Sequence, residues 1–134
     1  MPAALLDTNA VSDLMRDHPL VTARVANHPD PVITTVVVVG EIRFGLNRLP
    51  PGKKRADLEA RARRAFSKMP IEPVTGAIAE RYGELEAVLE ARGLNLADND
   101  LWIAATALTL NHTLVTRDSI FTQIPGLLVE DWTH

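Results

Sequence analysis

Short apolar or β-prone runs alternate along this chain with longer segments of helical periodicity, and this alternation constrains the fold more than any other feature. The runs lie at residues 3–6, 32–35, 113–115 and 127–129. Between them, apolar residues recur every three or four positions, as in helices with one buried face. Because strands that are joined through helices pair in parallel, the pattern predicts an α/β fold with a mostly parallel central sheet.

Residues 31–49 permit two interpretations. The β-branched run from Val32 to Val39 favours a strand, whereas several apolar residues from Val38 onward fall at helical spacing. We expect a strand that ends near Thr34 or Thr35. A helix should follow, carry Glu41 in its early turns and end before the prolines at 50 and 51.

The remaining elements follow from periodicity and from turn residues. A first helix is expected from about Val11, after the turn-forming residues 7–9. Further helices are expected at residues 54–69, at 75–93 with Thr75 as N-cap, and at 101–110 with Asp98 as cap. A short extended piece should lie between Pro70 and Pro73, and residues 127–129 should form a last edge strand.

Composition limits the class of protein. A chain of 134 residues with 46% hydrophobic residues can bury one core without disulfides, so we expect a single domain over residues 1–134. The absence of cysteine excludes zinc–thiolate sites, iron–sulfur clusters and thiol nucleophiles, and it gives no sign of an oxidising compartment. No apolar run approaches the roughly 20 residues of a membrane span, and we expect a cytoplasmic protein without a signal peptide.

The net charge of −3 hides an uneven distribution. Residues 53–68 contain seven basic and two acidic residues, a net charge of +5. Four of the basic residues fall on one flank of the predicted helix: Lys54, Arg61, Arg64 and Lys68. Such a flank is most often simply solvated, but beside an acidic pocket it would guide an RNA backbone.

Four acidic residues stand at the edges of the expected elements. Asp7 follows the first apolar run, Glu41 lies early in a helix, Asp100 opens another helix, and Asp118 follows the run at 113–115. The carboxyl ends of parallel strands meet at one edge of a sheet, so these side chains should converge there. Clustered carboxylates repel one another unless a cation lies among them, and oxygen ligands suit Mg²⁺ or Mn²⁺ rather than zinc. The chemistry expected from one or two such ions is phosphodiester hydrolysis.

Each acid also has a simpler interpretation. Asp7, taken alone, is more often a helix cap than a metal ligand. Glu41 is flanked by apolar residues and needs a partner, which Arg43 or Arg117 would supply in a structural salt bridge. The four histidines have no spacing typical of metal ligands and are expected at the surface. The combination of four acids is what favours the metal site.

Four segments of the chain resemble PIN-domain ribonucleases and, more narrowly, the VapC-type toxins of type II toxin–antitoxin systems. They are Leu6-Asp7-Thr8-Asn9, residues 39–46 (VGEIRFGL), residues 99–107 (NDLWIAATA) and residues 114–118 (LVTRD). The similarity covers essentially the whole chain. It implies a three-layer α/β/α fold, Mg²⁺-dependent endoribonuclease activity, a homodimer, and inhibition by a cognate VapB-type antitoxin whose tail occupies the acidic groove.

The resemblance also implies roles for individual residues. Asp7, Glu41, Asp100 and Asp118 match the four acids of the family, as metal ligands and catalytic residues. Asp100 is selected over Asp98 by the pattern Asp-x-x-Ile-Ala-Ala, which leaves Asp98 as a capping neighbour of the site. Asn9 and Thr116 would hold the carboxylates or their waters.

Two other functions use similar residues. A receiver-like phosphoacceptor domain has an aspartate pocket with magnesium but needs a late lysine, and this chain has none after Lys68. A haloacid-dehalogenase-like phosphatase needs an aspartate where Asn9 stands. A non-catalytic PIN-like module that binds RNA or protein would have a broken acidic set, whereas all four positions are filled here.

Overall fold

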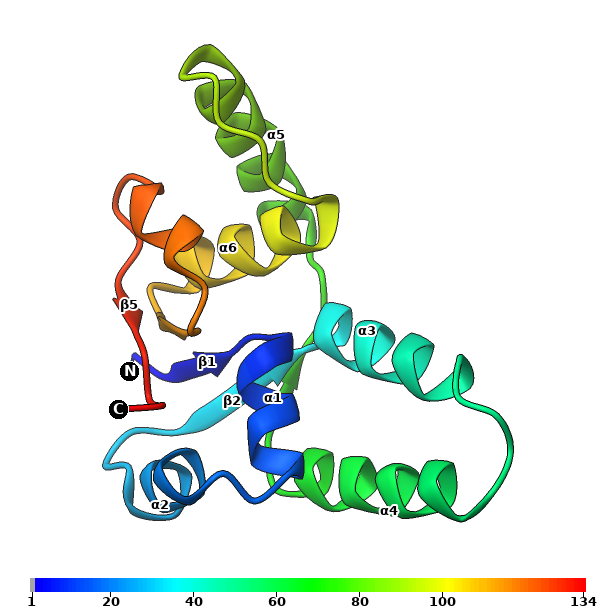
Figure 1. Cartoon of the computed structure of the whole chain (residues 1–134). Helices are drawn as coiled ribbons and strands as arrows, with labels where there is room; N and C mark the ends of the chain where they lie inside the picture. Colours follow the sequence, from blue (N-terminus) through cyan, green and yellow to red (C-terminus); the bar gives the residue numbers. More distant parts are fainter. Residues whose placement is uncertain (1) are drawn as a thin grey trace.

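A computed structural model describes residues 2–134, and its centre is a parallel sheet with the strand order β3-β2-β1-β4-β5 (Figure 1). The strand pairs are all parallel, which confirms the predicted α/β class. The strands are short: β1 Ala4–Leu6, β2 Val32–Thr35, β3 Ile71–Glu72, β4 Thr113–Val115 and β5 Val129–Glu130.

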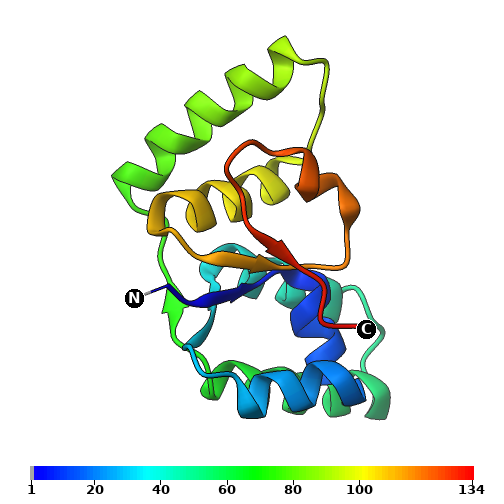
Figure 2. The same ribbon diagram turned by 90° about the vertical axis from the view of Figure 1, so that its left-hand side faces the viewer.

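Helices cover both faces of this sheet. Their bounds are α1 Thr8–Met15, α2 Pro19–Asn27, α3 Val36–Asn47, α4 Lys53–Ser67, α5 Gly76–Ala91 and α6 Asp98–Leu110, with a 3₁₀ helix η1 at Ser119–Gln123. In Figure 2, α5 and α6 lie over one face, and α2 and α4 lie below the other. The arrangement is the three-layer α/β/α architecture.

The core is built around β1, the middle strand. Leu5 and Leu6 are fully buried there, and Leu114 of β4 and Ile103 of α6 are equally inaccessible. A strand that is paired on both sides and covered on both faces has no polar side, which explains why the first run of the sequence is continuously apolar. No helix within residues 2–134 is both long and apolar enough to cross a membrane.

The ambiguous segment at 31–49 changes from strand to helix at Thr35, as predicted. Thr35 has an extended backbone, and its hydroxyl accepts a hydrogen bond from the Val38 N–H at 3.2 Å, which caps α3. The valines that follow are helical despite their β preference, because Val38 and Ile42 are buried in the core on one face of α3.

Three predicted boundaries were wrong. Helix α1 begins at Thr8 rather than near Val11, because the Asp7 carboxylate caps it by accepting a hydrogen bond from the Ala10 N–H at 2.8 Å. Asp98 does not cap α6: it is the first residue of the helix, Ala97 is the N-cap, and no side chain caps this end. The last strand begins at Val129 rather than at 127, although it is at the edge of the sheet as expected.

Three of the four histidines are less exposed than predicted. His18 accepts a hydrogen bond from the Val21 N–H at 3.4 Å and caps α2, and His28 packs against Trp132. His112 is half-buried, and its Nδ1 accepts a hydrogen bond from the Ala3 N–H at 2.9 Å. Burial lowers the pKa of His112, so its neutral form holds the first strand. Only His134 is highly exposed among these four.

Candidate active site

Asp7 lies where the central strand ends and α1 begins. Its N–H donates to the Val115 carbonyl at 3.1 Å, so the end of β1 is joined to the end of β4. Only 3% of Asp7 is exposed, and burial raises its pKa to about 6. Hydrogen bonds from Thr116 and Ala10 oppose this rise, while the charges of Asp100 and Asp118 add to it. Asp7 is therefore both a helix cap and a member of an acidic cluster.

Asp100 is the second member of this cluster. It is the third residue of α6 and is half-buried. Burial raises its pKa, and repulsion from Glu41 and then from Asp118 raises it further. Side chains from α3, α6 and the segment after β4 therefore share one electrostatic environment with Asp7, although they are far apart in the sequence.

Glu41 is held by a hydroxyl group rather than by a cation. The Thr8 hydroxyl donates to its carboxylate at 2.5 Å. Both arginines that the sequence offered as partners are engaged elsewhere, Arg43 with Glu59 at 2.8 Å and Arg117 with Asp13 at 3.3 Å. The role of Thr8 was not predicted from the sequence. Its position directly after Asp7, in the first turn of a helix, could have indicated a hydroxyl near the acids.

Thr116 connects two of the acids. This threonine is 2% exposed, its side chain hydrogen-bonds Asp7, and its oxygen accepts from the Asp118 N–H at 3.0 Å. Asp118 in turn caps η1 by accepting from the Ile120 N–H at 3.1 Å. The segment that carries Asp118 is thus fixed to the segment that carries Asp7.

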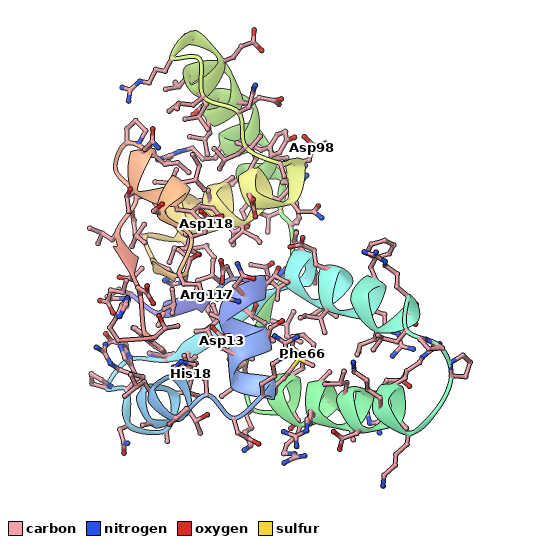
Figure 3. All side chains as sticks on the ribbon, viewed as in Figure 1. Asp13, His18, Phe66, Asp98, Arg117 and Asp118 are labelled. Carbon is pink, nitrogen blue, oxygen red and sulfur yellow. The ribbon has the colours of Figure 1, made fainter. Side chains whose placement is uncertain are left out.

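Other predicted residues lie apart from these contacts. Asp98 is exposed, and its carboxylate accepts a hydrogen bond from the Tyr82 hydroxyl at 3.4 Å, on the side of α6 that faces α5 (Figure 3). Trp102 stacks on the same tyrosine with ring centroids 3.9 Å apart. Asn9 is half-buried in the first turn of α1, and its role as a partner of the acids stays a prediction.

The basic flank of α4 packs against the other end of α1. Arg61 donates to the Met15 carbonyl at 3.0 Å and pairs with Asp17 at 2.8 Å. Together with Arg64 and Lys68 it lines a cavity of about 390 Å³ between α1, α2 and α4. Asp7 caps the opposite end of α1, about 12 Å away at 1.5 Å per residue. This flank does not touch the acids, and its contact with RNA stays a prediction.

The donor set fits a hard divalent cation. All of its ligand atoms would be carboxylate oxygens. Burial is the main reason why the pKa values of Asp7 and Asp100 are raised, and the charges of neighbouring carboxylates add to both shifts. Within residues 2–134, no three aspartate, glutamate or histidine side chains lie close enough together to hold a metal ion as they stand. Mg²⁺ needs only one or two direct carboxylate ligands, because it keeps several waters, so Asp7 and Asp100 would suffice as direct ligands.

Comparison with known proteins identifies the family to which this chain belongs. The family model of the PIN domain matches residues 4–127. The chain therefore belongs to the PIN-domain family, and the receiver-like and phosphatase-like alternatives fall away.

Individual relatives are similar over almost their full length. Ribonuclease VapC2 of Rickettsia felis is 29% identical over 132 residues, with 96% of each chain covered. Toxin FitB of Neisseria gonorrhoeae is 31% identical over 123 residues, with 86% of this chain and 87% of FitB covered. The crystal structure of Rickettsia felis VapBC2 bound to a promoter DNA fragment contains a chain that superposes with a TM-score of 0.88 at 28% identity, covering 97% of this chain and 98% of that one.

Proposed function

We propose that this PIN-domain protein is a Mg²⁺-dependent endoribonuclease, formed by residues 1–134 as one domain, and that it acts as the toxin of a toxin–antitoxin pair. The observation that carries the proposal is that acids from four separate segments meet at one edge of the sheet. Asp7 and Asp118 follow the paired strands β1 and β4, Thr8 next to Asp7 holds Glu41, and Asp100 lies near enough for its charge to act on Asp7. Clustered carboxylates repel one another without a cation and so destabilise the fold. Their presence together is therefore better explained by metal binding than by a contribution to folding stability.

The residues divide into ligands and supports. Asp7 and Asp100 would hold the cation, with Glu41 and Asp118 as further ligands or as acceptors for the protons of the attacking water. Thr116 orients Asp7, and Thr8 orients Glu41. A bound Mg²⁺, or Mn²⁺ in its place, would polarise a phosphate oxygen and lower the pKa of a bound water.

The test is a cleavage assay on a mixed RNA pool. With Mg²⁺ present we expect internal cuts whose ends can be mapped, and with a chelator we expect none, because without a cation the carboxylates repel the RNA phosphate and nothing lowers the pKa of the attacking water. Restoring Mg²⁺ after chelation should restore cleavage. Equal cleavage with and without the chelator would argue against metal dependence, and intact RNA under all conditions would favour a non-catalytic PIN-like module.

The proposed partners are a cognate VapB-type antitoxin and a second copy of the chain, and the proposed location is the cytoplasm. The structures of VapBC complexes among the relatives support an antitoxin partner. A second copy would cover exposed apolar side chains such as Phe44 on α3, which is 64% accessible.

The basic flank of α4 is proposed as an outer guide for RNA. Charge reversal at Lys54, Arg64 and Lys68 should weaken RNA binding and make its salt dependence shallower. With fewer phosphates neutralised, fewer counterions are released from the RNA when it binds. Affinity is measured by fluorescence anisotropy at several salt concentrations. The matched control for the double reversal at Arg64 and Lys68 is the double reversal at Arg81 and Arg92, which are exposed on or just after α5. A slope equal to that of the control would remove α4 from RNA binding.

A further inference from the structure

Arg117 is the cation that lies closest in sequence to the acidic cluster, and the proposed function has not used it. It stands between Thr116 and Asp118, both of which are coupled to Asp7. Its side chain lies along α1, where Nε is 3.3 Å from Oδ2 of Asp13. Figure 3 shows Asp118, Arg117 and Asp13 following one another on the same face of the molecule.

The ion pair between Arg117 and Asp13 is unsuited to a purely structural role. Oδ2 of Asp13 is buried and has no hydrogen bond within the described residues, because the contact with Arg117 falls short of hydrogen-bond geometry. A buried carboxylate oxygen without a hydrogen bond is costly, and an ion pair with an exposed partner returns little stability. What the pair does is to place the guanidinium beside α1, with its Nε toward Asp13.

The guanidinium of Arg117 contacts Asp13 but keeps free hydrogen-bond donors. The arginine side chain is 47% exposed, whereas Asp13 is 13% exposed. The contact with Asp13 runs through Nε, and neither Nη group donates a hydrogen bond within residues 2–134. Two parallel N–H donors on a rigid plane match the oxygens of a phosphate group. The free edge of Arg117 therefore has the chemistry of a phosphate site.

RNA is a polyanion and is repelled by four carboxylates. A positively charged side chain beside the carboxylates would offset this repulsion. The α4 flank cannot meet this need directly, because Arg61 is bound to Asp17 and Asp57 near the far end of α1. Arg117 is on the segment that carries Asp118. We propose that Arg117 is an RNA-positioning residue, oriented by Asp13, which binds a phosphate of the RNA beside the one that is cleaved. This inference rests on the proposed function and specifies how the site holds its substrate.

The first test measures RNA binding without cleavage. In the Asp7→Asn background, a short single-stranded RNA should bind about tenfold more weakly when Arg117 is replaced by alanine, which is the loss expected for one charge-assisted phosphate contact. The slope of log affinity against log salt should become shallower by about 0.7, the value for one phosphate of a single strand. Arg117→Lys should keep the slope but recover only part of the affinity, since lysine lacks the planar fork.

The matched control is Arg43→Ala. Arg43 is 51% exposed and also pairs with one carboxylate, on Glu59, so its loss removes the same charge and a similar ion pair. It should leave RNA affinity and salt slope within about twofold of the parent, because this guanidinium is already engaged at 2.8 Å. Equal effects of Arg43→Ala and Arg117→Ala would overturn the proposal.

A second variant separates RNA contact from folding. Arg117→Ala leaves the Asp13 carboxylate unpaired, whereas Asp13→Asn combined with Arg117→Ala removes both charges. The double variant should bind RNA as weakly as Arg117→Ala and should unfold at the same urea concentration as the parent. Parent-like affinity in the double variant would show that only the structural pair mattered and would overturn the proposal.

Cleavage kinetics distinguish this inference from the proposed function. With Asp7 intact, Arg117→Ala should raise KM about tenfold and change kcat by less than about twofold, as for a residue that binds substrate and transition state equally. A wild-type protein that binds RNA through Arg117 but never cuts it would refute only the nuclease function. A wild-type protein that cuts RNA with KM unchanged by Arg117→Ala would refute only the role of Arg117.

Discussion

Replacing either Asp7 or Asp100 by asparagine is expected to reduce RNA cleavage by on the order of a thousandfold, the loss typical of removing one group that stabilises charge in a transition state. Asparagine keeps the shape of the side chain, and at position 7 it keeps the oxygen that caps α1. What it removes is the negative charge through which each residue is coupled to the rest of the cluster. Initial rates on single-stranded RNA with saturating Mg²⁺ measure the effect.

Asp98→Asn is the matched control for this experiment. Asp98 and Asp100 lie two positions apart at the start of α6, and both carry the same charge, but Asp98 is exposed and contacts Tyr82 instead of the cluster. We expect this variant to cleave RNA at close to the wild-type rate. If Asp98→Asn lost as much activity as Asp100→Asn, the assignment of the acids within α6 would be wrong.

Asp7→Asn is also expected to make the protein more stable in the absence of divalent cations. The folded-state pKa of Asp7 is about 6, above its ordinary value of 3.8. The unfolded chain therefore ionises first, and stability falls as pH rises from about 4 to about 6. At pH 7 the variant should be more stable by up to about 3 kcal/mol, from 1.36 kcal/mol for each pKa unit, and at pH 4 the difference should disappear. Urea unfolding at both pH values, in the presence of a chelator, measures it.

Magnesium should reduce this stability difference. Wild-type protein binds the cation and gains stability with its concentration, while the variant lacks one ligand and gains less. The gap between the two proteins at pH 7 should therefore narrow as Mg²⁺ is added. A variant that is less stable than wild type at pH 7 without metal, or a gap of the same size at pH 4, would contradict the electrostatic account of Asp7.

The sequence was sufficient to predict the parallel sheet, and to predict that two of the acids follow its strands, for a common reason. Parallel strands that are covered on both faces read as continuous apolar runs, and their carboxyl ends meet at one edge. Asp7 and Asp118 follow β1 and β4, which are paired in the sheet. Their location at the same edge followed from parallel pairing alone, whereas the strand order that makes β1 and β4 neighbours came only from the structure.

What could not be predicted depended on which side chains meet across the fold. Thr8 and Glu41 are 33 positions apart, and their contact requires the packing of α1 against α3. Arg61 carries a charge typical of an RNA-binding face, but the packing of α4 against α1 directs it to Asp17. The sequence suggests Arg117 as a partner of Glu41, whereas the turn after β4 directs it to Asp13. Periodicity identifies faces of helices but not the residues opposite them.

The most direct test of the central claim is to locate a cation among the four carboxylates. Crystals grown or soaked with Mn²⁺ should show an anomalous difference peak bounded by Asp7 and Asp100, within reach of Glu41 or Asp118, and crystals of Asp7→Asn should lose that peak. Carboxylates that diverge with no peak between them, or an ion of equal strength in the Asp7→Asn crystals, would contradict the account.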